Sequence, residues 1–95
     1  DLELGDVEAA LCEHPDVAQA VVVPVPHPSY GSSLRAFVLP REGAGDPLVP
    51  ADVLRFLQSR LPEYMLPWEL VLVSELPHTS TGKVDRQLLQ RTRSP

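Results

Sequence analysis

Lys83 is the residue of this chain whose type and setting most clearly suggest chemistry. It follows Gly82 directly, after the hydroxyl-rich stretch at residues 79–81, and Asp85 and Arg86 come shortly afterwards. Glycine permits backbone geometry that other residues resist, and a lysine ammonium on its long stem can reach a phosphate or a carboxylate as a point charge. The same pattern also fits a solvated surface lysine beside a helix start, and local chemistry alone favours that second interpretation.

A nucleotide-binding P-loop is excluded at this lysine. That motif requires a glycine five positions before Gly82, where Pro77 stands, and a serine or threonine directly after the lysine, where Val84 stands. Lys83 is therefore not cradled by a phosphate-binding loop of that kind.

Other residues with chemical potential do not form a recognisable site. Cys12 and His14 lie two apart near a predicted helix end, but a metal site needs further ligands at compatible spacing. The serines at residues 29–33 show no nucleophile-elbow pattern. We therefore expect neither a metal site nor a serine nucleophile.

The composition excludes several classes of protein. The chain has 95 residues, of which 43% are hydrophobic and 22% charged, and this is typical of one globular domain. The formal net charge of -5 argues against a nucleic-acid binder, which needs a broad basic face. No apolar run approaches the ~20 residues of a membrane span, and the acidic start is unlike a secretory signal. We expect a cytoplasmic protein, without a membrane or nucleic-acid partner, whose one cysteine forms no internal disulfide.

The hydrophobic periodicity predicts an α+β domain. Helices are expected at residues 6–14, at 52–61 and from about 85 onward, and strands at 17–23, 34–39 and 68–73. The strands should form a small three-stranded antiparallel sheet covered by helices, followed by the lysine-bearing loop and a short helix. The expected order is 2-1-3, with the first strand central. Pro24 must then end that strand, because a central strand cannot lose a donor in mid-ladder.

Three segments resemble, in order, the motifs of one family. Residues 2–11 (Leu-Glu-Leu-Gly-Asp-Val-Glu-Ala-Ala-Leu) resemble the motif that opens the C-terminal domain of adenylate-forming enzymes. That family includes the adenylation domains of nonribosomal peptide synthetases, the acyl-CoA synthetases and the luciferases. Residues 61–67 (Leu-Pro-Glu-Tyr-Met-Leu-Pro) and 76–86 (Leu-Pro-His-Thr-Ser-Thr-Gly-Lys-Val-Asp-Arg) resemble two later motifs, the last of which carries the catalytic lysine. The likeness covers essentially the whole chain and favours a functional Lys83.

The resemblance implies that residues 1–95 are the mobile lid of an enzyme that activates a carboxylic acid with ATP. In this family a large N-terminal domain binds ATP, Mg²⁺ and the acid, and the small C-terminal domain turns its lysine into the site where acyl-AMP forms. The lid then rotates to present a second face, where a pantetheine thiol takes the acyl group as a thioester. By this resemblance Lys83, with Gly82, serves the first step. The second step is assigned to the turn formed by Leu2, Glu3, Leu4 and Gly5.

The resemblance also implies that much of the enzyme lies elsewhere. The family's ATP-phosphate loops, acyl pocket and hinge residue are absent from residues 1–95, so we expect the isolated chain to be inactive in acyl-AMP formation. Asp1 stands where the family often has an arginine and departs from the pattern there.

The motifs favour the peptide-synthetase type within this family. The expected partners are the N-terminal core domain and a phosphopantetheinylated carrier protein. One alternative is the lid of an acyl-CoA synthetase, with CoA as the acceptor. A second is a free-standing small α+β binding or oligomerisation module, in which Lys83 is an ordinary surface residue. The identity of the acid cannot be read from these residues, because its pocket would lie in the large domain.

Overall fold

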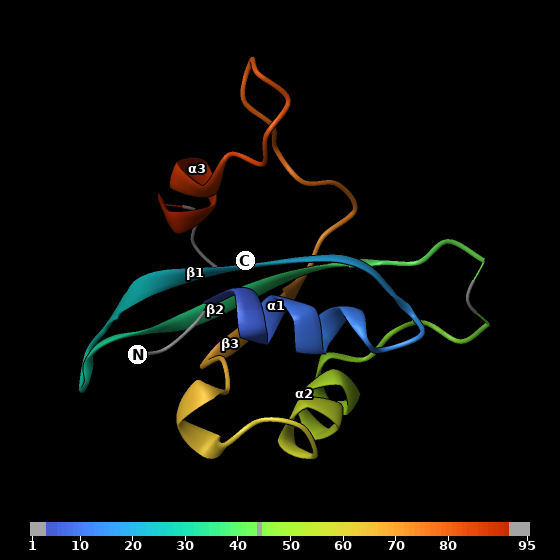
Figure 1. The fold of residues 1–95 in the computed structure, drawn as a ribbon, viewed down its shortest axis with the longest axis horizontal. Coiled ribbons are helices and arrows are strands. Elements are labelled where there is room, and N and C mark those ends of the chain that lie inside the picture. Colours follow the sequence, from blue (N-terminus) through green and yellow to red (C-terminus); the bar gives the residue numbers. More distant parts are fainter. Residues whose placement is uncertain (1–3, 44, 92–95) are drawn as a thin grey trace.

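A three-stranded sheet forms the centre of the computed structural model, which describes residues 4–43 and 45–91 (Figure 1). The strands are β1 (Val17–His27), β2 (Gly31–Pro40) and β3 (Glu69–Leu72). The helices are α1 (Leu4–Cys12), α2 (Pro50–Gln58) and α3 (Arg86–Arg91), with a short 3-10 turn η1 (Glu63–Met65) before β3. The expected α+β class is confirmed.

The strand order is β1-β2-β3, so β2 is the central strand. Strands β1 and β2 form an antiparallel hairpin that extends from the Val17–Pro40 pair to the His27–Gly31 pair. Strand β3 lies on the other side of β2 and runs parallel to it, with Arg35 opposite Glu69. The expected order 2-1-3 and the expected fully antiparallel pairing are therefore wrong. The third strand does run opposite to the first, but it pairs with the second.

The prolines of β1 explain why β3 does not pair with that strand. β1 continues through Pro24 and Pro26 to His27, whereas Pro24 was expected to end it. The N–H of Val22 points away from β2, because it donates to a carboxylate oxygen of Glu8 at 2.8 Å. Residues two apart in an antiparallel strand face the same side, so both proline nitrogens lie at the outer edge. They cost the hairpin no hydrogen bond, but they leave this edge without the donors that another strand would need.

Each face of the sheet is covered by different helices (Figure 1). Helices α1 and α2 lie on one face, and α3 lies on the other together with the segment that leads to it. Successive residues of β1 alternate between the two faces, as a strand requires. The core on the α1 side includes Val7, Leu11, Val22, Val38, Val53 and Leu57. The core on the α3 side includes Val21, Val23, Val25, Phe37, Leu76 and Leu89.

Helix α1 begins earlier than the sequence pattern predicts. It starts at Leu4 instead of residue 6, and it ends at Cys12, shortly before Pro15. Gly5 therefore lies in the first turn of a helix and not in an extended turn. No helix within residues 4–43 and 45–91 is both long and apolar enough to cross a membrane.

Candidate functional site

Residues 77–85 form a tight hairpin that projects from the α3 side of the sheet, drawn in orange in Figure 1. The N–H of Thr79 donates to the carbonyl oxygen of Lys83 at 2.7 Å, and the N–H of Gly82 donates to the carbonyl oxygen of Thr79 at 3.0 Å. His78 pairs with Val84 in an antiparallel bridge beside them. A turn that is followed by a left-handed residue is a common closure for a short hairpin. Lys83 therefore extends from a closed loop.

Gly82 supplies the left-handed residue of this hairpin. Its φ angle is +88°, a backbone conformation that residues with a Cβ rarely adopt. A Cβ built at this position would meet nothing within 4 Å. The need for glycine here is thus conformational, and the space around Gly82 is open.

The side chain of Lys83 is exposed at this hairpin. In the part of the chain that the structure describes, no hydrogen bond or ion pair holds its ammonium group. Four arginines of the described residues are paired with carboxylates, as Arg60 is with Glu13 at 2.8 Å. The Lys83 ammonium can therefore approach an anion that a partner or a ligand provides.

The two arms of the hairpin are fixed to the sheet by apolar contacts. Leu76 on the entering arm and Leu89 of α3 are buried in the core cluster that contains Phe37. The N–H of Asp85 donates to the carbonyl oxygen of Pro77 at 2.8 Å, which ties the arms together. The Asp85 carboxylate accepts the N–H of Leu88 at 3.1 Å and so caps the start of α3.

Arg86 adds a polar attachment that no sequence motif predicted. Its guanidinium donates to both carboxylate oxygens of Glu8, at 2.9 and 3.2 Å, and to the carbonyl oxygen of Val22 at 3.3 Å. Glu8 belongs to α1, so this contact passes around the open edge of β1 and joins elements on opposite faces of the sheet. Glu8 and Arg86 both lie inside segments that resemble the family motifs, at residues 2–11 and 76–86. Nothing else in the sequence indicated that these two side chains meet.

The turn that was expected to serve the second step is only partly described. Leu2 and Glu3 lie outside the described residues, whereas Leu4 and Gly5 open α1. Gly5 is exposed, and a Cβ built on it would meet nothing within 4 Å. Leu4 lines a groove of about 520 Å³ together with Pro24, Tyr30, Leu34 and Tyr64, among others.

The structure does not bring Lys83 and Gly5 into one site. The helix that begins with Leu4 and Gly5 packs on one face of the sheet, and the hairpin that carries Lys83 is anchored on the other. The domain therefore offers two separate surfaces, one cationic and one at the start of α1.

Residues 6–83 match the family described as the AMP-binding enzyme C-terminal domain. The chain belongs to that family. It is 40% identical over 88 residues to a dimodular nonribosomal peptide synthase of Bacillus subtilis, a match that covers 93% of this chain and 4% of that protein. It is also 40% identical over 85 residues to a probable CoA ligase of Humulus lupulus, which covers 88% of this chain and 16% of that protein.

Solved structures of similar proteins share the fold of this AMP-binding enzyme C-terminal domain. The amide bond synthetase McbA from Marinactinospora thermotolerans superposes with a TM-score of 0.84 at 34% identity, over 94% of this chain and 18% of that one. ATP-bound MatB from Rhodopseudomonas palustris gives a TM-score of 0.86 at 27% identity, over 94% of this chain and 17% of that one. The chain thus spans less than a fifth of the length of each of these four relatives.

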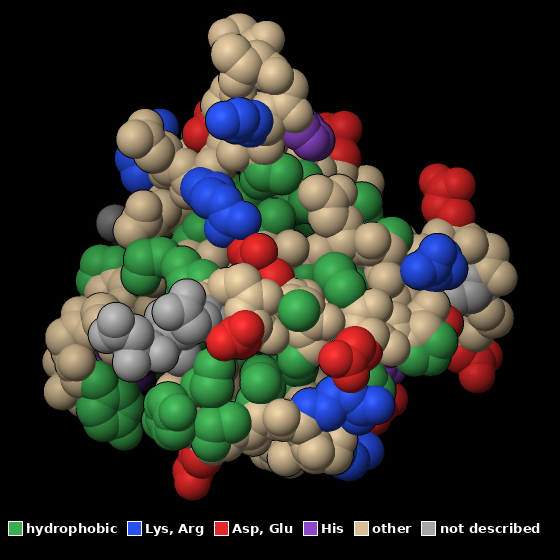
Figure 2. Space-filling model, viewed as in Figure 1, with side chains coloured by type: hydrophobic (Ala, Val, Ile, Leu, Met, Phe, Trp, Pro, Cys, Tyr) green, Lys and Arg blue, Asp and Glu red, His purple; other side chains and the backbone are tan. Residues whose placement is uncertain are grey.

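Aromatic side chains surround the groove beside α1 in this C-terminal domain. Tyr30 and Tyr64 line it and are 79% and 75% exposed. The imidazole of His27 stacks on Tyr30, with ring centroids 4.4 Å apart, and meets the edge of Trp68 at 4.3 Å. Figure 2 shows hydrophobic side chains gathered at this end of the molecule, below the β1–β2 hairpin.

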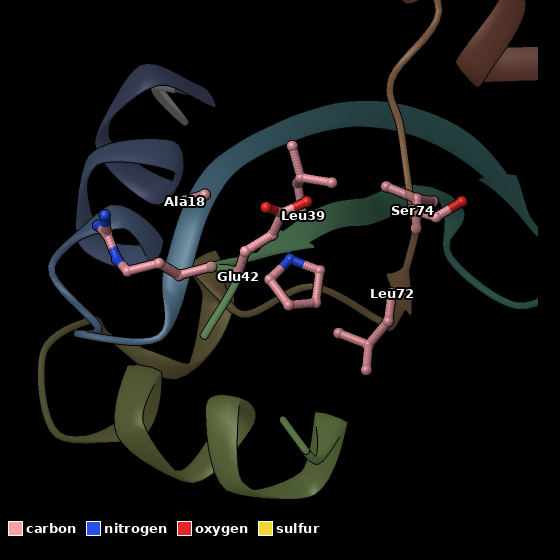
Figure 3. Close-up of a pocket in the computed structure, with 8 residues that line it drawn as sticks. Ala18, Leu39, Glu42, Leu72 and Ser74 are labelled. Atoms are coloured by element: carbon pink, nitrogen blue, oxygen red, sulfur yellow. The ribbon is translucent and has the colours of Figure 1, made fainter. Parts of the chain in front are cut away.

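A larger groove of about 700 Å³ lies elsewhere in the domain, where β2 ends and the chain leaves β3 (Figure 3). Ala18, Leu39, Leu72 and Ser74 are among the residues that line it. Its walls are mainly apolar, and neither Lys83 nor Gly5 belongs to them. The Lys83 hairpin is therefore not part of this groove.

The described residues do not supply a metal site to this C-terminal domain. Over 4–43 and 45–91, no three His, Cys, Asp or Glu side chains gather as ligands would. The thiol of Cys12 is exposed near the end of α1.

Proposed function

We propose that this chain is the lid of an ATP-dependent ligase, in which Lys83 supplies the positive charge for acyl-AMP formation. Family membership supports the class of enzyme. The observation that carries the assignment to Lys83 is the exposed ammonium on a hairpin that is closed by backbone hydrogen bonds and projects from the domain. A group placed in this way can enter a site that belongs to another domain.

The chemistry of the first step favours a cation at that position. A carboxylate oxygen of the acid attacks the α-phosphorus of ATP, a new C–O–P linkage forms, and the bond to the β-phosphate breaks to release pyrophosphate. The approaching oxygens carry like charges, and negative charge builds up in the transition state. An ammonium placed between them stabilises that state most strongly when the closing lid excludes water. Delivery by a mobile domain lets closure complete the site.

The large N-terminal domain holds ATP, Mg²⁺ and the acid in this proposal. The described residues fit that division, because the cation that they offer stands on a hairpin that projects from the domain. Mg²⁺ would neutralise phosphate charge when it is bound there. The chain alone is then unable to form acyl-AMP, and pyrophosphate exchange with the 95-residue chain should show no turnover.

The surface at the start of α1 serves the second step in this proposal. The exposed Gly5, with open space around it, leaves room for a thiol-bearing arm to pass. A thiolate attacks the acyl carbon of acyl-AMP, a thioester forms, and AMP leaves. The acceptor is a pantetheine group on a carrier protein, and CoA is the alternative, because both peptide synthases and CoA ligases are among the similar proteins.

The replacement Lys83→Ala in the full-length enzyme tests the first step. We expect pyrophosphate exchange to fall by orders of magnitude, because the lost contact belongs to the transition state, whereas binding of the acid changes little. Transfer of the acyl group from preformed acyl-AMP to the thiol should persist. Arg91→Ala, which removes an exposed cation at the end of α3, is the control and should leave both steps unchanged.

Two results would contradict this assignment. Unchanged pyrophosphate exchange in the Lys83→Ala enzyme would make Lys83 an ordinary surface residue, as in a binding or oligomerisation module. An equal loss of both steps, with a lower melting temperature, would mean that the replacement had damaged the fold.

A further inference from the structure

We propose that Glu8 and Arg86 form a positioning pair that fixes the Lys83 hairpin over β1 while acyl-AMP forms. This inference rests on the function proposed for Lys83. Neither residue is expected to touch the substrates. Their role is to set where the ammonium stands when the lid closes.

Strand β1 fixes the geometry of the pair, because both Glu8 and Arg86 bond to the backbone of Val22. One oxygen of Glu8 accepts the N–H of Val22 at 2.8 Å and also a hydrogen bond from Arg86 at 2.9 Å. The same guanidinium group donates to the other oxygen of Glu8 at 3.2 Å and to the carbonyl oxygen of Val22 at 3.3 Å. The backbone N–H and the backbone carbonyl of Val22 thus both fix the position of the guanidinium, the N–H through Glu8 and the carbonyl directly. A planar fork can make these contacts together, whereas a lysine ammonium is a point charge.

A short and stiff connection links this contact to Lys83. Arg86 follows Lys83 by three residues, and its own N–H donates to the carbonyl oxygen of Val84 at 3.0 Å. The N–H of Asp85 is bonded to the opposite arm of the hairpin, at Pro77. A shift of Arg86 is therefore passed on to the base of the hairpin, and so to Lys83.

The pair is better suited to positioning than to overall stability. The side chains of Glu8 and Arg86 are 19% and 51% exposed, and ion pairs that reach solvent contribute little to folding. Small displacements of a catalytic group have much larger effects on rate. A positioning role therefore predicts a loss of activity without a matching loss of stability.

The test uses Arg86→Lys and Glu8→Gln in the full-length enzyme. Arg86→Lys keeps the charge but loses the fork, and Glu8→Gln keeps an acceptor for the N–H of Val22 but loses the charge. We expect the kcat of acyl-AMP formation to fall about ten- to a hundredfold in each. The KM values for ATP and acid should stay within about twofold, as when only a transition-state contact is weakened. The melting temperature and the transfer of preformed acyl groups should change little.

A double replacement and a matched control complete the experiment. The enzyme with both Arg86→Lys and Glu8→Gln should be about as active as the less active of the two single variants. The two losses should not add, because both replacements break the same contact. Arg60→Lys alters a comparable pair, in which Arg60, just after α2, donates to Glu13, just after α1, at 2.8 Å. That pair lies away from the Lys83 hairpin, so Arg60→Lys should leave acyl-AMP formation unchanged.

The outcomes separate this inference from the proposed function. If Lys83→Ala abolishes acyl-AMP formation while Arg86→Lys and Glu8→Gln leave it unchanged, the positioning role is rejected and the role of Lys83 stands. If the pair variants lose both steps together with thermal stability, or if their losses add in the double variant, the positioning role is also rejected. Unchanged activity in Lys83→Ala would reject the function itself.

Discussion

Gly82 donates its backbone N–H to the carbonyl oxygen of Thr79 across 3.0 Å, and this bond closes the turn from which Lys83 extends. The left-handed backbone at Gly82, where φ is +88°, then turns the chain so that the carbonyl oxygen of Lys83 accepts the N–H of Thr79 at 2.7 Å. The direction of a side chain with proposed catalytic function therefore depends on the conformation of the residue before it.

Replacement of Gly82 tests that dependence. Gly82→Ala should disfavour the closed hairpin by roughly 1–2 kcal/mol, the usual cost of a left-handed conformation for a residue with a Cβ. Gly82→Asn should cost less, because asparagine tolerates this conformation better. Pyrophosphate exchange by the full-length enzyme should therefore be slowed clearly by alanine and only slightly by asparagine. Equal losses in both variants would point to a steric cause, although the space around Gly82 is open.

Gly5→Leu tests the second surface. A Cβ built at Gly5 meets nothing within 4 Å, and leucine favours a helix over glycine by about 1 kcal/mol. Urea unfolding of the chain should therefore show slightly higher stability. In the full-length enzyme, acyl-AMP formation should be preserved, whereas thioester formation should be obstructed.

Ala9→Leu is the matched control for Gly5→Leu, because Ala9 is exposed one turn further along α1. It adds similar bulk away from the helix start and should leave thioester formation unchanged. A Gly5→Leu enzyme that loses acyl-AMP formation but keeps thioester transfer would show that the two surfaces have been assigned in the wrong order.

The prolines of β1 predict how the open edge of the sheet behaves. Replacing Pro24 and Pro26 together by valine restores two N–H groups that point away from β2, and an exposed edge with free donors can pair with another chain. We expect this variant to self-associate, which sedimentation velocity would detect at increasing protein concentration. Pro28→Val changes a proline in the turn after β1 and should remain as monomeric as the parent chain. A monomeric double variant would mean that Glu8 and Arg86 protect the edge without the prolines.

The local features of the fold could be predicted from the sequence, because they depend on nearby residues. The pairing of the first two strands and the helix near residue 52 follow from periodicity and turn residues, and both are present. The position of β3 depends instead on which edge of the hairpin is available. The outer edge of β1 is blocked by Pro24 and Pro26 together with the contact between Glu8 and Arg86. Glu8 and Arg86 are 78 residues apart, and no periodic pattern encodes such a contact.

In the candidate site, too, the local backbone could be predicted from the sequence, whereas the contact between distant residues could not. The glycine before Lys83 indicated a special backbone, and Gly82 is indeed left-handed. The attachment of the hairpin through Arg86 was not predicted, because it needs a partner from a helix at the other end of the chain. The family resemblance therefore pointed to Lys83 as the residue proposed for catalysis, and the structure adds what holds its hairpin in place.

The parallel alignment of β3 with β2 also orders the events of folding. The β1–β2 hairpin joins residues that are close in sequence, such as His27 and Gly31, so its loop closes at little entropic cost. Arg35 and Glu69 meet across 34 residues, and that contact becomes favourable only after the intervening segment has ordered. The β1–β2 hairpin is therefore expected to form early, together with the helix α1 that packs on it, and β3 and the segment bearing Lys83 are expected to join later.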